Sequence, residues 1–418
     1  MNTKLINIQN YLNQYIKGQD DVIKLISVML INRDRIDKLQ LSDIDIDYPK
    51  DELTPPNIML IGPTGCGKTE LVKRISEISN RFWFRMPCTT LSSVGYAGKD
   101  VSDILKYAIE TAIKEISERR RCEILDHQLD KLLLQATKPL IVTDKYIDDL
   151  KSYVDIYRKH KNHSLLQEQL YATVPEPIIQ YTPNGKPIII GVEYQKTKDT
   201  VKTIIDKLIE DELFKQKDDI QKEAIKLVEN GIIMLDEIDK ICGGKLNNIT
   251  MYGVQRELLA LVEGSIFYTE YGPINTKNIL FISAGAFQVV TPNKMIPELR
   301  GRFPIKIKLN PLTKDDFVEI LKNSRLSPMK RFQAIMKADG ITVTFTENSI
   351  EYLAWYAEQL NKKEQLGARR LWELFDKYLI DLYLLETDCE ITIDLLKQYL
   401  PEIQNNTKIN SESHIMYC

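Results

Sequence analysis

Residues 62–69 constrain what this chain can fold into more than any other segment, and they read Gly-Pro-Thr-Gly-Cys-Gly-Lys-Thr. The run fits the pattern G-x-x-x-x-G-K-[ST], whose glycines let the backbone wrap closely around phosphate groups. A short apolar run at 58–61 precedes it and predicts a buried strand, and a helical pattern follows from about Lys68 to Ile78. Strand, glycine-rich turn and helix in this order predict a phosphate-binding loop at the edge of a sheet.

The loop has the chemistry that a nucleotide requires. Its backbone N–H groups point inward as donors, and the following helix adds its positive N-terminal end. Lys68 would reach the β- and γ-phosphates, and the Thr69 hydroxyl would bind Mg²⁺. A chance match to the pattern is the alternative, and the flanking strand and helix argue against it. The nucleotide-binding residues expected in this segment are Gly65, Cys66, Gly67, Lys68, Thr69 and Glu70.

Two carboxylates follow a second apolar run. Residues 232–235 predict another buried strand, which ends in Asp236 and Glu237. Asp236 would hold Mg²⁺ together with Thr69, and Glu237 would polarise the attacking water. An acidic pair after an apolar run also occurs at ordinary solvated strand ends, so the prediction depends on its pairing with the phosphate loop. A third apolar run at 279–282 ends in Ser283.

Short apolar strands that alternate with helices predict an α/β fold, a P-loop parallel sheet flanked by helices. The segment 117–225 is highly charged and carries prolines at its centre, and we interpret it as a helical insertion with solvated faces. After Pro311 the pattern is all-helical. The expected domains are an α/β nucleotide-binding domain at 1–105 and 228–310, a helical insertion domain at 106–227, and a C-terminal all-helical lid domain at 311–418.

Composition excludes several classes of protein. Lys and Arg number 56 against 59 Asp and Glu, a net charge of -3, which argues against a dedicated nucleic-acid binder. The six cysteines form no C-x-x-C pair and only four histidines occur, so a structural zinc site is not expected. Neither an apolar run long enough to span a membrane nor a secretory signal is visible, and we expect a cytoplasmic protein that contacts no membrane.

The combined motifs resemble the AAA+ ATPases, and five stretches are similar to the ClpX/HslU branch and to the HslU (ClpY) family within it. The resemblance covers about 1–105 and 228–395, and a long insertion between the two nucleotide motifs is what separates HslU from ClpX. The family's usual Ala-Ser order is reversed here at Ser283 and Ala284. The stretches that carry the resemblance are Tyr15 to Asp20, Gly231 to Cys242, Gly285 to Val289, Ile296 to Arg302, and Gly367 to Arg370.

The resemblance implies roles for residues outside the two motifs. Ile16 and Lys17 would flank the adenine, and Arg369 would sense the γ-phosphate from the lid. Arg302 would be an arginine finger for the neighbouring subunit, and Glu298 would lie near the subunit boundary and the nucleotide. The catalytic residues would then be Lys68, Glu237 and Arg302. A surface ion pair is the alternative for any one of the arginines.

Two further segments match features of the family that grip substrates and dock partners. Gly95-Tyr96-Ala97-Gly98 resembles a pore loop, in which glycines give mobility and one aromatic side chain gives a sequence-tolerant grip. An ordinary loop is the alternative. The tail at 411–418 ends in apolar residues that would dock on a peptidase, or it is a frayed terminus.

These resemblances predict an ATP-dependent protein unfoldase that threads polypeptides through a homo-hexameric ring into an HslV-like peptidase. ATP and Mg²⁺ would be bound, and unfolded or tagged proteins would be the substrates. The alternatives are a nucleic-acid-remodelling AAA+ motor, a stand-alone ATP-dependent chaperone without a peptidase, and a nucleotide-dependent scaffold without hydrolysis.

Overall fold

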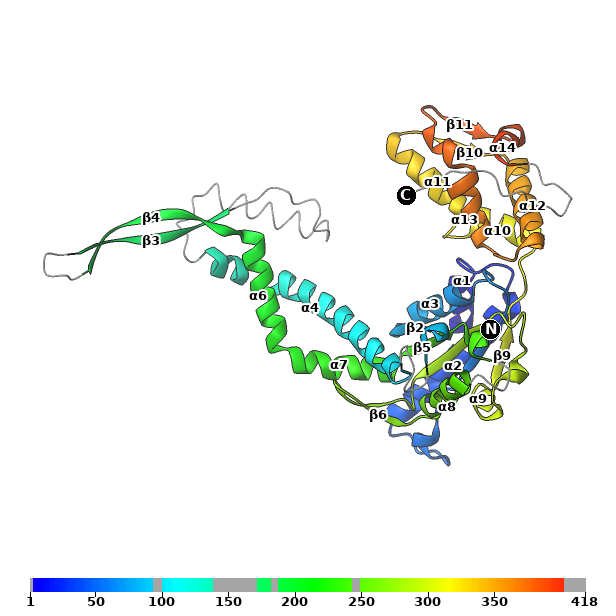
Figure 1. Cartoon of the computed structure of the whole chain (residues 1–418), viewed down its shortest axis with the longest axis horizontal. Coiled ribbons are helices and arrows are strands. Elements are labelled where there is room, and N and C mark those ends of the chain that lie inside the picture. The colour runs from blue at the N-terminus through cyan, green and yellow to red at the C-terminus, as the bar shows by residue number, and fades with distance from the viewer. Residues whose placement is uncertain (1–2, 93–99, 138–170, 182–186, 243–248, 402–418) are drawn as a thin grey trace. The chain divides into compact units, whose positions relative to one another are not determined.

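The computed structural model describes residues 3–92, 100–137, 171–181, 187–242 and 249–401 (Figure 1). Two compact units are formed, one by residues 1–106 with 227–418 and the other by residues 107–226. The division of the first unit into a nucleotide-binding domain and a lid stays a prediction.

A five-stranded sheet forms the centre of the first unit, with strand order β2-β5-β8-β1-β9 and every pair parallel. The prediction of a P-loop α/β fold with a parallel sheet is confirmed, as are the three predicted strands. Because the strands are parallel, the carboxyl ends of β1, β5 and β8 lie at the same edge of the sheet. Ligands bind at this edge in such folds. The strands are β1 (Ile58–Ile61), β2 (Trp83–Pro87), β5 (Ile232–Asp236), β8 (Leu280–Gly285) and β9 (Ile305–Lys308).

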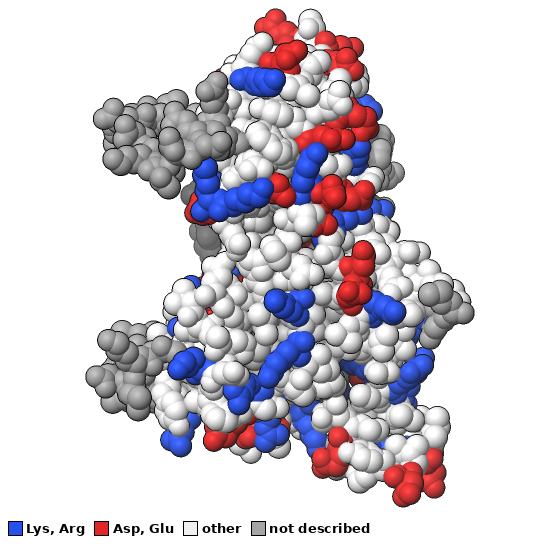
Figure 2. Space-filling view, turned by 90° about the vertical axis from the view of Figure 1, so that its right-hand side faces the viewer, with Lys and Arg blue, Asp and Glu red and all other residues white. Residues whose placement is uncertain are grey.

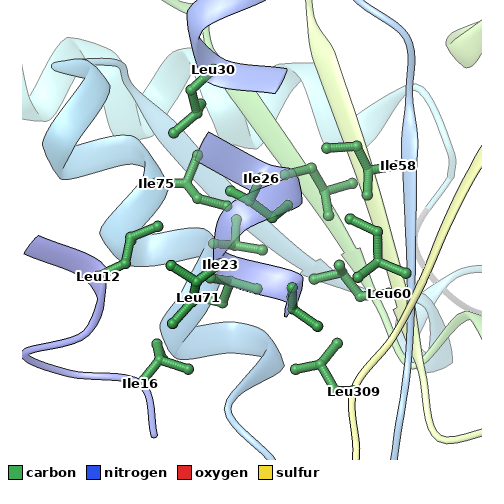
Figure 3. Close-up of a cluster of buried hydrophobic side chains, with 14 of the residues drawn as sticks. Leu12, Ile16, Ile23, Ile26, Leu30, Ile58, Leu60, Leu71, Ile75 and Leu309 are labelled. Atoms are coloured by element: carbon green, nitrogen blue, oxygen red, sulfur yellow. The ribbon is translucent and has the colours of Figure 1, made fainter. Parts of the chain in front are cut away.

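Helices flank this sheet. A small antiparallel hairpin of β6 and β7 follows α8 in the sequence. In the predicted helix α3, Leu71 and Ile75 are one turn apart and both are fully buried. They pack with Ile23 and Ile26 of α2 and with Leu60 of β1 in one apolar cluster (Figure 3). Burial of each such side chain contributes about 1.5–3 kcal/mol. The elements are α1 (Thr3–Leu12), α2 (Asp20–Leu41), α3 (Lys68–Ser79), α8 (Ile249–Val262), α9 (Pro297–Gly301), β6 (Ile266–Thr269) and β7 (Gly272–Asn275).

The C-terminal part of this unit has its own core, built around Phe317, Phe332, Leu353 and Phe375. It is predominantly helical, but the prediction that it is all-helical is wrong, because two short strands pair in parallel. Each strand has only three residues, too few for a period-two pattern to show in the sequence. The elements are α10 (Lys314–Asn323), α11 (Pro328–Met336), α12 (Glu347–Lys363), α13 (Arg369–Glu373), α14 (Ile393–Tyr399), β10 (Val343–Phe345) and β11 (Cys389–Ile391).

The second unit consists of helices and an antiparallel ribbon of β3 and β4. The ribbon corrects the expectation of a helical insertion. Pro175 and Pro177 lie within β3, where a two-stranded ribbon leaves free edges that tolerate proline, whereas a helix interior does not. Three consecutive arginines of α4, residues 119–121, form ion pairs with Asp206 of α6 and Glu223 of α7. The elements are α4 (Asp103–Thr137), β3 (Tyr171–Tyr181), β4 (Pro187–Thr200), α6 (Val201–Lys215) and α7 (Lys217–Glu229).

Short helical turns complete the described part of the chain. None of the described helices combines the length and the apolar character that crossing a membrane requires. A π-helical turn continues α13, and the other turns are of the 3-10 type. The π turn is Leu374–Tyr378, and the 3-10 turns are Lys50–Glu52, Cys88–Thr90, Ile238–Ile241, Pro292–Lys294, Lys337–Asp339 and Ile380–Leu384.

Candidate functional site

The glycine-rich loop leads directly from β1 into α3. Gly65 and Gly67 have φ values of +73° and +99°, a region that side-chain-bearing residues rarely adopt. Lys68 is the first residue of α3, and its Nζ donates to the carbonyl oxygens of Gly62 at 2.6 Å and Pro63 at 2.8 Å. The ammonium group is therefore held inside the loop by its own backbone, next to the helix N-terminus that favours an anion.

A cavity of about 500 Å³ opens where the loop meets the ends of β5 and β8. It brings together most of the residues predicted to bind nucleotide, although they come from distant parts of the sequence. The C-terminal part of the unit closes the other side through residues of α10 and α13. The predicted residues that line the cavity are Ile16, Lys17, Gly65, Cys66, Gly67, Lys68, Thr69, Glu70, Asp236, Glu237 and Arg369.

Asp236 is held in place by a basic residue that the sequence analysis did not identify. Arg85 of β2 donates to Asp236 Oδ2 from Nε at 2.8 Å and from Nη2 at 2.7 Å, and it also lines the cavity. The Glu237 N–H donates to the other carboxylate oxygen at 2.9 Å. Since Asp236 is only 6% exposed, these donors compensate for the burial of its charge. The signal available in the sequence was a single arginine within an otherwise apolar strand.

Glu237 has an unusual backbone conformation. Its φ is +56°, which is rare for a residue with a side chain and is found where surrounding structure imposes it. The next residues turn sharply into the 3-10 segment at 238–241, so the acid pair stands at the point where β5 ends. Buried Asp239 follows, and its Oδ1 accepts from the Ala286 N–H at 3.2 Å. The ends of β5 and β8 are thereby joined beside the cavity.

Glu70 and the aromatic Tyr15 share one basic partner. Arg74 is 8% exposed and forms an ion pair with Glu70 Oε1 at 2.6 Å, while its guanidinium lies 3.7 Å from the centre of the Tyr15 ring. Both partners line the cavity, next to Ile16. Arg74 also pairs with Glu77 at 2.6 Å, and it therefore links Glu70 of the loop helix to the N-terminal segment.

Two thiols near the site are kept in the neutral form. Burial raises the pKa of Cys66, which lies within the loop and faces the cavity. Burial also raises the pKa of Cys88, and the nearby Asp236 carboxylate acts in the same direction. A neutral thiol adds no negative charge where a nucleotide's phosphates would bind.

Ser283 lies outside the cavity. It is fully buried in β8, and its Oγ donates to the Ile58 carbonyl oxygen of β1 at 3.5 Å. Gly285 and Ala286 from the end of the same strand line the cavity instead. A Cβ at Gly285 would lie 2.7 Å from Phe287 Cε2 and 2.8 Å from Asp239 Oδ1, so a side chain there would displace both neighbours.

Arg302 and Glu298 lie apart from the other predicted site residues. They belong to α9 and its C-terminal end, and neither lines the cavity. Glu298 is exposed, and Arg302 is 51% exposed and pairs with Glu263 at 2.7 Å. The predicted pore loop, Gly95, Tyr96, Ala97 and Gly98, and the tail at 411–418 lie outside the described residues.

The cavity also contains residues that the motifs could not reveal. Gln288 follows β8, and Trp372 lies one helical turn after Arg369. Leu312, Ile320 and Leu326 add apolar surface from the C-terminal part. A helical pattern identifies the buried face of a helix but does not show which helix will cover the end of a strand that is distant in sequence. The sequence alone therefore could not assign any of these residues to the cavity.

Comparisons with known proteins match most of the chain. The model of the ATPase family associated with various cellular activities (AAA) matches residues 58–144, and that of the AAA domain (Cdc48 subfamily) matches residues 187–306. An ATP-dependent protease ATPase subunit HslU from Sinorhizobium medicae is 35% identical over 96% of this chain and 97% of its own length. HslU from Thermosipho africanus is 34% identical over 89% of both chains, and HslU from Staphylococcus carnosus is 31% identical over 97% of this chain and 96% of its own.

Proposed function

The chain belongs to the HslU family of AAA ATPases, and from that premise we propose that it is an ATP-dependent protein unfoldase acting as a homo-hexameric ring with an HslV-like peptidase. The observation that carries the proposal is one cavity lined by the P-loop, by Asp236 and Glu237, and by Arg369. Phosphate-binding, acidic and basic groups thus converge on one site, the combination that nucleotide hydrolysis needs.

ATP would bind with its β- and γ-phosphates in the loop. The backbone N–H groups and the Lys68 ammonium would share the phosphate charge, and Ile16 and Lys17 would flank the base. Lys68 needs only to exchange the Gly62 and Pro63 carbonyl oxygens for phosphate oxygens, because Nζ already lies in the loop. Cys66 and Gly67 would contribute their backbone, and Glu70 would act through its pairing with Arg74.

Thr69 and Asp236 fit Mg²⁺, because a hydroxyl and a carboxylate oxygen are hard ligands and both face the cavity. Arg85 and the Glu237 N–H fix the orientation of the Asp236 carboxylate that would hold the ion. When bound, Mg²⁺ would neutralise charge on the phosphates. Glu237 would orient a water molecule for attack on the γ-phosphorus and accept its proton, while the bond from phosphorus to the ADP oxygen breaks.

A ring is supported by the positions of Arg302 and Glu298. Glu298 on α9 and Arg302 at its C-terminal end are both accessible and lie outside the cavity of their own chain, so a role at a nucleotide requires the site of a neighbouring subunit. Arg369 would respond to the γ-phosphate from within the same subunit. The Tyr96 loop would grip an unfolded or tagged polypeptide, and the tail at 411–418 would dock on the peptidase. We place this activity in the cytoplasm.

The deciding experiment purifies the native full-length protein and asks which macromolecule stimulates its ATPase. We expect an unfolded protein such as casein to stimulate phosphate release, and a small peptidase subunit to co-purify. Stimulation by DNA, absent with casein and falling with salt, would instead indicate a nucleic-acid motor. On the face shown in Figure 2, basic side chains predominate across the lower half and acidic ones gather near the top and the bottom edge, so the two outcomes are separated by the ATPase assay and not by surface charge. Unfolding without a peptidase would indicate a stand-alone chaperone, and binding without phosphate release a scaffold.

A further inference from the structure

The turn before Arg369 rests directly on the P-loop, backbone against backbone. The Ala368 N–H donates to the Gly65 carbonyl oxygen at 3.0 Å. Gly367 has a φ of +58°, and a Cβ there would lie 2.4 Å from the Gly65 carbonyl carbon. A Cβ at Gly65 would in turn lie 1.9 Å from the Leu366 carbonyl oxygen. The contact therefore has no space for a side chain from either partner.

One side chain holds this turn in shape. Asn361, near the end of α12, is only 9% exposed, and its Oδ1 accepts from the N–H groups of Leu366 and Gly367 at 3.0 Å each. Its Nδ2 donates to the Gly367 carbonyl oxygen at 3.4 Å. Asn361 and Gly367 also line a second cavity, of about 190 Å³, together with Thr64 and Cys66 of the loop. A single amide thus fixes the part of the turn that contacts Gly65.

The other end of the turn is fixed independently. Arg370 is 6% exposed, donates to the Glu364 carbonyl oxygen at 3.0 Å, and forms ion pairs with Glu364 and Glu373. Arg369 lies between this anchored residue and the turn held by Asn361, is itself exposed, and lines the main cavity. The direction from which Arg369 enters the cavity is therefore set by the turn behind it.

We propose that Asn361 is a positioning residue of the nucleotide site, which seats Gly367 on Gly65 and thereby sets the reach of Arg369 toward the γ-phosphate. The inference rests on the proposed function, because it assumes that the cavity binds ATP and that Arg369 distinguishes ATP from ADP. If Asn361 only stabilised the end of α12, replacing it would lower stability and leave the preference for ATP over ADP unchanged. Nucleotide selectivity therefore distinguishes a stabilising role from a positioning role.

The experiment measures the affinities of a non-hydrolysable ATP analogue and of ADP by competition with fluorescent ADP, using the full chain in Mg²⁺ buffer. Asn361→Ala and Arg369→Ala should each lower the ratio of the two affinities about tenfold, the value of one charge-assisted contact. In the double variant the affinity ratio should fall at most about twofold below that of either single variant, because both substitutions remove the same interaction. Asn361→Asp keeps an acceptor oxygen and should restore most of the ratio. Asn348→Ala, an exposed asparagine on the same helix, should leave the ratio unchanged.

The outcomes distinguish failure of the positioning role from failure of the proposed function. A wild-type ratio in Asn361→Ala, with the ratio lost in Arg369→Ala, overturns the positioning role and leaves the proposed function standing. Additive losses in the double variant also overturn it. Absence of nucleotide binding by the unaltered protein contradicts the proposed function itself. If Asn361→Ala does not fold, Gly367→Ala disturbs the same contact through backbone strain and lack of space, and a wild-type ratio there overturns the inference.

Discussion

The pairing of Arg85 with Asp236 leads to a prediction about stability. Arg85→Met removes two charge-assisted donors, at 2.7 and 2.8 Å, from a carboxylate that is 6% exposed. Removing one partner of a fully buried pair typically costs about 3–5 kcal/mol. The Arg85 side chain is 41% exposed, so water can reach the vacated place. We therefore expect the free energy of unfolding to fall by a smaller amount, about 1–2 kcal/mol.

Urea denaturation of the nucleotide-free protein, monitored by circular dichroism, measures the loss in the free energy of unfolding. Hydrogen exchange of the peptides that cover β2 and β5 shows whether the loss is local. The control is Arg331→Met, because Arg331 and its partner Asp376 are 48% and 50% exposed and their distance is 3.0 Å. A surface pair of this kind contributes about 0–1 kcal/mol. If Arg85→Met cost no more than Arg331→Met, and exchange in β5 were unchanged, the assigned support of Asp236 by Arg85 would be refuted.

Four further predictions concern the proposed motor. Glu237→Gln should bind ATP with nearly wild-type affinity in a filter assay yet release phosphate at least about 100-fold more slowly, the scale of general-base catalysis. Mixed rings of inactive Arg302→Ala and inactive Glu237→Gln subunits should recover part of the ATPase rate, because a finger acting between subunits is worth roughly 10³–10⁵. Tyr96→Ala should keep basal ATPase activity within about twofold and lose unfolding of a tagged fluorescent protein, because an aromatic grip touches the substrate and not the nucleotide. Deletion of 411–418 should spare ATPase activity and ring assembly but abolish stimulation of the partner peptidase, which a fluorogenic peptide reports, because several weak tails must engage together.

Each of these has an outcome that contradicts it. Wild-type turnover in Glu237→Gln removes the catalytic carboxylate from the mechanism. Verified mixed rings without recovered activity exclude a role for Arg302 between subunits. Equal loss of ATPase and unfolding in Tyr96→Ala would make that residue structural. Undiminished peptidase stimulation after the deletion would assign the coupling to the body of the ring.

The elements that the sequence predicts well are those whose local pattern and packing agree. Ile58 to Ile61 is apolar throughout, and in the structure it is an inner strand of the sheet with helices packed on it, so the local pattern and the surroundings both favour a buried strand. Lys68 begins a helix because Gly67 supplies the left-handed turn before it. Asp236 and Glu237 were placed by the same logic, since parallel strands end on one edge of the sheet.

What the sequence could not supply depends on long-range pairing. Arg85 becomes part of the site because β2 lies next to β5 in the sheet, and strand order is not encoded in local periodicity. The ribbon of β3 and β4 was missed because the charged, proline-bearing segment was interpreted as a helical insertion, and the pairing of two strands is not visible in local periodicity. Ser283 reads as a polar strand end, yet β8 continues to Gly285 and buries it. The roles assigned to Arg302, Glu298 and Tyr96 stay predictions.

The placement of the insertion between two neighbouring strands has a consequence for the order of folding. Pro87 ends β2 and pairs in register with Asp236 of β5, so the strands can join only after the long intervening segment closes into a loop. The ion pairs of residues 119–121 with Asp206 and Glu223 bring distant points of that segment together. Once these ion pairs form, the stretch of flexible chain that must still close between β2 and β5 is roughly threefold shorter. The entropic cost of bringing the two strands together then falls by about 1 kcal/mol. An insertion that folds early would therefore hold β2 and β5 close together and speed their pairing. Weakening its arginine ion pairs should slow refolding of the nucleotide-binding part while the free energy of unfolding changes little.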